Sequence, residues 1–253
     1  MALSRDDALV VRLSDYSETS QVVTLLARQH GLLRLMAKGV RRSTRARVAV
    51  GLDVLEHGEV EFTLPKDATG LGTLTQWTQM DGWTGLRSEL DALYVGMYAA
   101  ELTASLTEEQ DPHPGLFEAL LALLGALTLP QGAAAGESRG DAVCAVIRFQ
   151  AALLRAIGYA PNLRACGVCG RSAQAATGRA HFSSAIGGFV CGSCASRCAE
   201  KRPLARELLG PSSAQAPALT WFDVLDYHLA HVASRPMRSG EALRVRWGLA
   251  PLD

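Results

Sequence analysis

The sequence lacks the features of a membrane protein and of a secreted protein. Charged residues interrupt every apolar stretch before it reaches the roughly 18 residues that a membrane-spanning helix needs. The first seven residues carry Arg5, Asp6 and Asp7 and no apolar run, so we expect no signal peptide. With 48% apolar and 20% charged residues, the composition favours a folded chain over a disordered one. We therefore expect a cytoplasmic protein with a packed core.

The sequence also lacks the common catalytic motifs. It contains no G-x-S-x-G, GxxxxGK[ST] or HExxH segment. His57-Gly58-Glu59 matches the H-x-E part of the zinc deaminase motif, but the nearest CxxC is over a hundred residues away and follows Ala165 instead of a proline. We predict that the protein is not an enzyme and has no catalytic residue.

A third absence is that of acidic residues between Thr19 and Leu52. The net charge of the whole chain is zero, yet this window holds seven cations: Arg28, Arg34, Lys38, Arg41, Arg42, Arg45 and Arg47. A solvated strand and loop is the ordinary explanation of a charge run. Here, however, the like charges repel one another with no counter-ion in the window, so a polyanionic partner is the better explanation.

The first 80 residues have the pattern of a small β-barrel. Short runs of alternating or β-branched residues predict about five strands, at 8–13, 22–26, 32–38, 59–64 and 71–80. Five strands in this length favour an OB-fold. Period two places Arg34 and Lys38 on one strand face, and Thr73, Thr75 and Trp77 on one face of the last strand. Arg41, Arg42 and Arg45 then follow on the next loop, and guanidinium groups suit phosphate oxygens.

Helical patterns follow residue 82. Leu86, Leu90, Leu93 and Met97 are spaced as one helix face, and residues 116–129 form a second apolar helix. Asp141 is a candidate N-cap of a third helix, on whose apolar face Cys144 is expected to be buried. Thr220 and Asp223 resemble a capping box that opens a later helix. We expect an α+β multidomain protein with four parts: an OB-fold DNA-binding domain at 1–80, a helical domain at 81–162, a zinc-binding module at 163–199, and C-terminal helices at 200–253 that pack on the helical domain.

Four cysteines form two CxxC pairs that are typical of a structural zinc site. The candidate ligands are Cys166, Cys169, Cys191 and Cys194, with 21 residues between the pairs. Two such knuckles complete a tetrahedral four-cysteine site, which leaves no open position for catalysis. Disulfides fit a cytosolic chain poorly, and a redox pair would need one CxxC at a helix start in a βαβ unit. Cys198 is a possible competing ligand. We predict one structural Zn²⁺.

Particular segments resemble a known family. Residues 15–20, Gly31 at the start of a strand, and residues 37–43 (Ala-Lys-Gly-Val-Arg-Arg-Ser) resemble the N-terminal signature of the RecO family of bacterial DNA repair proteins. Residues 154–161 before the first CxxC resemble that family's passage from helix to zinc module. The order of OB-fold, helices and zinc module also agrees along the chain. One departure is that acidic residues return from Asp53 onward, where family members often remain basic.

The resemblance implies a recombination mediator associated with the nucleoid. Such a protein binds single- and double-stranded DNA, anneals complementary strands and, with RecR, promotes RecA loading on DNA covered by single-strand-binding protein (SSB). By position, Lys38, Arg41 and Arg42 match the family's basic motif, and Arg34 and Arg45 flank it. The alternative is a protein-interaction adaptor with incidental DNA affinity. Its docking surfaces would be the acidic block 81–141, with charge −8, and the basic block 142–211, with charge +7.

Overall fold

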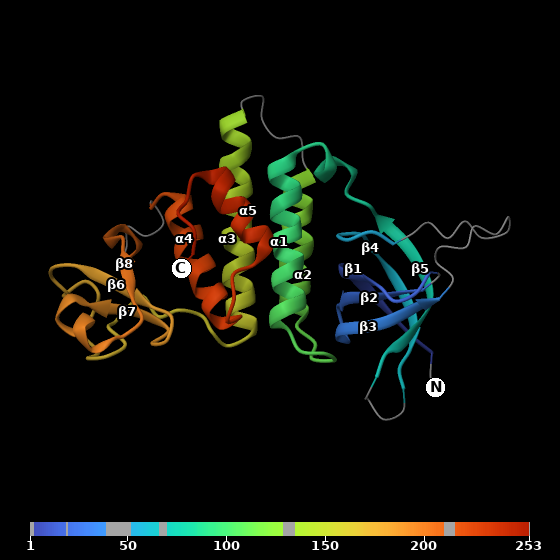
Figure 1. Ribbon diagram of the computed structural model, residues 1–253, viewed down its shortest axis with the longest axis horizontal. Coiled ribbons are helices and arrows are strands. Elements are labelled where there is room, and N and C mark those ends of the chain that lie inside the picture. Colours follow the sequence, from blue (N-terminus) through green and yellow to red (C-terminus); the bar gives the residue numbers. More distant parts are fainter. Residues whose placement is uncertain are drawn as a thin grey trace. The chain divides into compact units, whose positions relative to one another are not determined.

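The computed structural model describes residues 3–18, 20–38, 52–65, 70–128, 135–209 and 216–252 (Figure 1). The chain divides into two compact units, Met1–Gln131 and Gly132–Asp253. The first unit contains a β-barrel and two long helices, and the second contains three helices and a small cysteine-bearing module. The four-part division expected from the sequence remains a prediction.

The barrel of the first unit is closed and has five strands. Its strands follow the order β1-β2-β3-β5-β4, and only the β3–β5 pairing is parallel. This is the OB-fold barrel that the sequence predicts. The strands are β1 (Leu3–Asp15), β2 (Ser20–Ala27), β3 (Gly31–Lys38), β4 (His57–Thr63) and β5 (Gly72–Asp81).

Alternation along the strands builds the barrel core. In β3, Leu33, Leu35 and Ala37 are buried, whereas Arg34 and Lys38 between and after them are exposed. The inward side chains of β1, β2 and β4 join the same cluster, in which Val60 and Phe62 are fully buried. Period two therefore places the basic residues of β3 on the outer surface, as predicted.

Strand β5 departs from the predicted alternation. Its register against β4 shifts between the Phe62–Leu74 pair and the Glu61–Gln76 pair, so Thr75 is an extra, bulged residue. Leu74 and Trp77 consequently both pack against the barrel core. The prediction that Thr73, Thr75 and Trp77 share one face is wrong, because a bulge changes the face on which later residues lie.

Two helices follow the barrel after the short 3-10 turn η1 (Thr84–Arg87): α1 (Leu90–Leu106) and α2 (Pro114–Thr128). The buried face of α1 carries Ala92, Val95 and Ala99, and α1 packs against β1 and α2. Leu90 and Met97 are 50% and 37% exposed. The helix face predicted from Leu90 and Met97 is therefore wrong: the buried face also carries Tyr98 and Leu102, which are both fully buried.

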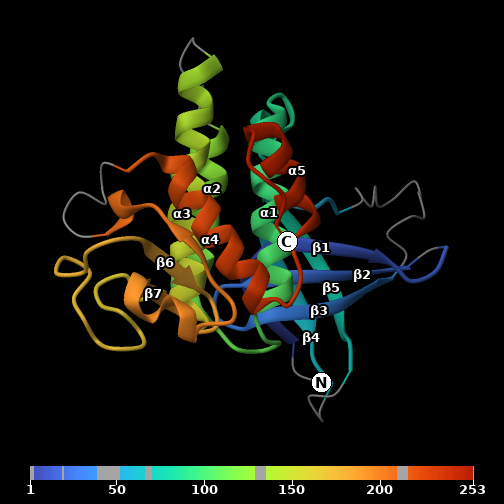
Figure 2. The same ribbon diagram turned by 60° about the vertical axis from the view of Figure 1, so that its left-hand side comes forward.

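The second unit begins with α3 (Ala135–Ala156) and ends with α4 (Ala218–Val232) and α5 (Arg238–Trp247). Helix α3 starts six residues before the predicted N-cap Asp141, and Cys144 is exposed instead of buried. Helices α3 and α4 pack side by side in both views (Figures 1 and 2). The rings of Phe222 and Trp247 meet edge to face with centroids 4.8 Å apart, which couples α4 to α5.

The module between α3 and α4 is a three-stranded sheet of order β7-β6-β8. Its strands are β6 (Ala180–Ser183), β7 (Gly188–Cys191) and β8 (Arg202–Leu204), with 3-10 turns η2 (Gly192–Arg197) and η3 (Arg206–Leu208). Its core is small and is rich in cysteine and alanine around Phe182 and Phe189. A core of this size needs a covalent or metal cross-link to be stable.

The predicted capping box at Thr220 and Asp223 does not form. Helix α4 opens at Ala218 after Pro217, with no side-chain cap. Asp223 instead accepts hydrogen bonds from Arg202 and Arg244, and Arg244 also donates to Asp226 over 2.9 Å. Arg244 and Asp226 are both 2% exposed, so this is a buried ion pair between α4 and α5.

Within the described ranges, no helix is long and apolar enough to cross a membrane.

Candidate functional site

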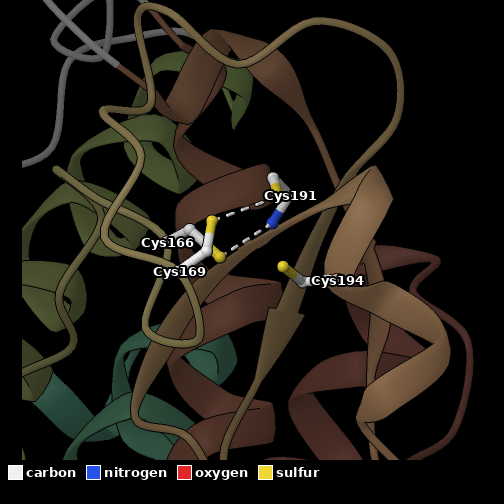
Figure 3. A group of neighbouring side chains, drawn as sticks. All are labelled: Cys166, Cys169, Cys191 and Cys194. Atoms are coloured by element: carbon white, nitrogen blue, oxygen red, sulfur yellow. Dashed lines mark hydrogen bonds between the residues drawn. The ribbon is translucent and has the colours of Figure 1, made fainter.

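The four predicted cysteine ligands lie together in the second unit (Figure 3). The sulfur atoms of Cys166, Cys169, Cys191 and Cys194 are all within 4.8 Å of one another. Cys166, Cys191 and Cys194 are buried, and Cys169 is exposed at the surface. Strand β7 ends at Cys191 and η2 carries Cys194, while the other pair lies on a loop after α3. The fold thus brings together two CxxC pairs that are separated in sequence.

Tight turns of the backbone aim these thiols at one point. The Gly170 N–H donates to the Cys166 carbonyl over 2.8 Å, and Gly170 has a φ of 72°, which favours glycine. The Cys191 N–H donates to the Cys166 sulfur over 3.4 Å. Backbone donors directed at sulfur are typical of a metal-binding knuckle, because they stabilise a thiolate.

The electrostatics of the cluster call for a cation. Burial works to raise the pKa of the Cys166 thiol, but backbone N–H groups of Cys191, Cys169 and Val168 outweigh it and lower that pKa to about 6. Burial, together with the Cys191 and Cys169 sulfurs, raises the pKa of the Cys194 thiol to about 12. One thiol therefore ionises readily while another resists, because like charges crowd the site. A divalent cation would allow all four to ionise.

The geometry fits zinc. The Cys169 and Cys191 sulfurs are 3.8 Å apart, far beyond a disulfide bond of about 2.05 Å. Four sulfurs at about 2.3 Å from a tetrahedral zinc lie about 3.8 Å from one another. Cys198 is not in the cluster: its thiol is buried and faces the Cys194 carbonyl at 4.0 Å. The described residues thus offer four sulfur ligands for one metal ion.

Polar contacts anchor the module to α4. Glu200 accepts hydrogen bonds from the Tyr227 hydroxyl, from Ser183 Oγ at 2.9 Å and from the Ala185 N–H at 3.0 Å. Burial works to raise the pKa of Glu200, but these donors outweigh it and lower that pKa. Arg202 of β8 pairs with Asp223 of α4. The cysteine-bearing module is therefore tied to the helices of its own unit.

The predicted DNA-binding residues are described only in part. Arg34 and Lys38 lie on β3 with exposed side chains on one face of the barrel. Arg41, Arg42 and Arg45 lie outside the described residues. Lys38 pairs with Ser20 at the end of β3 and is the last described residue before these three arginines in the sequence.

Acidic residues from elsewhere in the fold reach part of the basic stretch. Arg28 pairs with Asp7 at 2.8 Å and with Glu118, and its guanidinium lies over the Phe117 ring. Arg34 pairs with Glu109 at 3.2 Å. The window itself holds no acid, but residues outside it supply counter-ions to Arg28 and Arg34. Among the described cations of the stretch, Lys38 forms no ion pair with a described acid.

Arg12 is a basic residue of this surface that the sequence reasoning missed. Thr24 of β2 pairs with Arg12 on one side and with Arg34 on the other, so the three side chains form one row across three strands. Arg12 is exposed and has no ion-pair partner among the described residues. Arg12 precedes the acid-free window. Because Asp6, Asp7 and Asp15 are close to it in the sequence, the local net charge around Arg12 is not positive, and a charge count does not single it out. Arg12 and Arg34 of this row, together with Lys38 four residues further along the same face of β3, are called the barrel basic row below.

The fold and the cluster define an α+β protein that combines an OB-fold barrel, helices and a module whose four cysteines could hold a metal ion. Two family models match consecutive parts of the chain. Residues 1–83 match the family described as Recombination protein O N terminal, and residues 87–210 match Recombination protein O C terminal. The chain belongs to the RecO family of DNA repair proteins.

Curated relatives support this membership. A protein of Bacillus pumilus named DNA repair protein RecO is 32% identical over 244 residues, which cover 96% of this chain and 86% of the relative. The protein of the same name from Bacillus subtilis is 33% identical over 79% of this chain and 71% of its own length. The match to that of Rhodopirellula baltica is 33% identical over 74% of this chain but spans only 65% of the relative. None of these names states an enzymatic activity.

Proposed function

We propose that this protein is a recombination mediator that binds single- and double-stranded DNA and anneals complementary strands. In this proposal it acts with RecR to promote RecA loading on SSB-covered DNA, in the cytoplasm and on the nucleoid. The observation that carries the proposal is the barrel basic row, which presents Arg12, Arg34 and Lys38 on one exposed barrel face. OB-fold barrels bind nucleic acid on such strand faces.

The proposed contact is led by the phosphate backbone. Lys38, Arg41 and Arg42 are its centre, with Arg34 and Arg45 at its flanks and Arg12 added. Aromatic side chains near the row are few: Tyr16, in the turn between β1 and β2, is 67% exposed. With few stacking platforms, affinity comes from cations on phosphates and depends little on base sequence.

The four cysteines are the proposed ligands of one structural Zn²⁺. A set of four cysteine ligands has no open coordination position, so a bound zinc would cross-link the module instead of activating water. The thiolates of Cys166 and Cys191 would hold the metal on the buried side and Cys169 on the exposed side. The role of this chain's other residues is to support the ligands, through the N–H groups directed at sulfur.

The experiment that tests the proposed function is strand annealing. Complementary strands, bare or covered with SSB, are mixed with the full chain with and without RecR, and duplex formation is followed by fluorescence. We expect faster annealing of both substrates. DNA binding without faster annealing, or no effect on either substrate, would favour the adaptor alternative.

A further inference from the structure

A cavity of about 800 Å³ lies in the second unit, outside the cysteine cluster. Ala151 and Arg155 of α3 form one wall, Trp221 and Leu225 of α4 form another, and residues 160–164 and 172–174 close the side next to the first CxxC loop. Leu208 of η3 completes the apolar floor. The cavity is large enough for a drug-sized molecule or for one nucleobase with its sugar.

Two cations line this cavity. Arg155 and Arg164 line it and are exposed, and neither forms an ion pair with a described residue. Arg148 lies on the same stripe of α3 as Ala151 and Arg155, because residues at spacings of three, four and seven share a helix face. Arg171 lies on the same loop as Arg164. Backbone hydrogen bonds between the segments that carry these two arginines hold the two parts of the loop together. Two arginines in the lining, with two more on adjoining parts of α3 and of the loop, suit a polyanionic ligand.

Two of the polar side chains that line the cavity, Asn162 and Ser172, accept hydrogen bonds from the backbone, and Gln174 lines the cavity as well. Asn162 Oδ1 accepts from the Arg164 N–H at 2.9 Å, and Ser172 Oγ accepts from the Gln174 N–H at 3.3 Å. The cavity therefore offers an apolar and aromatic interior with arginines around it, and few free groups for reading a specific sequence. Trp221 is half-buried and packs against the core of the module, which holds its indole ring in place.

We propose that this cavity is a second binding site for single-stranded DNA, in which Trp221 contacts an unpaired base while Arg155 and Arg164 bind the flanking phosphates. Aromatic contact with a base together with arginine on phosphate is the usual pattern of sequence-tolerant single-strand binding. The inference rests on the DNA-binding function proposed above, and it deepens that function. One site in each unit allows a single chain to hold two strands, which annealing requires.

The test measures the affinity of the full chain for a fluorescein-labelled oligodeoxythymidylate by anisotropy. The cavity variant is Arg155→Glu with Arg164→Glu, and the barrel variant is Arg41→Glu with Arg42→Glu. Arg179→Glu with Arg197→Glu is the matched control, since both arginines are exposed on the module and neither lines the cavity. Trp221→Leu keeps apolar bulk but removes the aromatic face. A thermal melt of each variant verifies that it is folded.

We expect the cavity variant to bind the oligonucleotide at least about fivefold more weakly than the wild type. The slope of log K against log[salt] should become less steep by about 1.4, because two cations that neutralise phosphates are lost. Trp221→Leu lowers the affinity by about tenfold, as expected for one stacked base. The control binds as the wild type does. The barrel variant retains weak binding to the oligonucleotide. A variant that combines the barrel and cavity substitutions loses this remaining binding.

Wild-type affinity in the cavity variant overturns the inference while leaving the barrel site intact. Wild-type affinity in the barrel variant contradicts the proposed function instead, so the two failures are distinguishable. Binding of an oligoglutamate peptide that depends on Arg155 and Arg164, with DNA affinity unchanged in the cavity variant, would assign the cavity to an acidic peptide and overturn the inference.

Discussion

The Arg34 guanidinium on β3 donates a hydrogen bond to the Glu109 carboxylate at 3.2 Å, although the two residues are 75 positions apart in the chain. Both side chains are about half exposed, at 52% and 45%. Glu109 therefore competes with any phosphate that approaches Arg34. An exposed ion pair contributes only about 0 to 1 kcal/mol to the free energy of unfolding. We therefore expect the Arg34–Glu109 pair to affect DNA binding more than it affects stability.

Removing the Glu109 charge is expected to strengthen DNA binding. Glu109→Gln frees Arg34 and should raise the affinity for single strands by about two- to fivefold, with unfolding free energy changed by less than about 0.5 kcal/mol. Anisotropy titrations and urea denaturation measure the two effects. Glu108→Gln is the matched control, because this neighbouring side chain forms no ion pair with a described residue. Equal or weaker binding by Glu109→Gln would show that Arg34 does not contact DNA.

Salt dependence separates a DNA-binding protein from an adaptor. If about five phosphates of a single strand are neutralised, log K should fall with log[salt] at a slope near −3.5. Titrations at several salt concentrations measure this slope. A flat response would contradict DNA binding as the primary role.

Loss of one cysteine ligand should remove the metal. We expect wild-type protein to contain one zinc per chain, and Cys166→Ser to lose it and to be destabilised by several kcal/mol, since the small module core depends on the cross-link. Metal analysis and thermal melting measure the two effects. Cys198→Ser is the control, because Cys198 lies outside the cluster and should leave the zinc content unchanged. Wild-type protein without zinc would contradict the assignment of the four cysteines as ligands.

These sites were predictable to different extents. The CxxC spacing was sufficient to identify all four members of the cysteine cluster, because each knuckle is a local structure and two of them make one tetrahedron. Alternation in β3 likewise placed Arg34 and Lys38 on one outer face. Each CxxC knuckle and the alternation in β3 are local patterns, and four ligands from two knuckles are what one tetrahedral site needs.

The failures share a different cause. The pairing of Arg34 with Glu109, the alignment of Arg12 with Arg34, and the role of Asp223 depend on contacts between distant segments. The bulge at Thr75 depends on the register against β4. Composition and periodicity do not encode these contacts, so a local charge count overstated the free charge of two cations, Arg28 and Arg34, and missed Arg12.

His228 should make stability depend on pH. Burial lowers its pKa below the ordinary 6.5, and the hydrogen bond to the Tyr159 carbonyl, 2.9 Å from Nε2, only partly opposes this. The native state then keeps His228 neutral while the unfolded chain takes up a proton. The free energy of unfolding is therefore unaffected above about pH 6.5 and falls as pH drops below it, by up to about 1.4 kcal/mol per pH unit, until the native pKa is reached.

Urea denaturation at about pH 7.5 and about pH 5.5 measures the effect of His228. In His228→Gln the neutral amide cannot titrate, so the decrease in unfolding free energy should be smaller than in the wild type. An equal decrease in both proteins would assign the pH dependence to other groups.

Removing only one partner of the buried Arg244–Asp226 ion pair should lower the free energy of unfolding substantially. Arg244→Met leaves the Asp226 carboxylate, which is 2% exposed, without this cation, and we expect a loss of about 3–5 kcal/mol of unfolding free energy. Adding Asp226→Leu should restore part of it, since the uncompensated charge is then gone. Chemical denaturation of the single and double variants measures both. A double variant less stable than the single one would contradict this account.

The most direct test of DNA binding by the basic segment after β3 is the single-strand affinity of Arg41→Glu with Arg42→Glu, measured beside the Arg179→Glu, Arg197→Glu control. Both double variants change the charge equally. We expect the first to bind at least about tenfold more weakly than the wild type, with its zinc content unchanged, and the control to bind normally. Wild-type affinity in the Arg41, Arg42 variant would contradict the placement of the main DNA contact on the barrel.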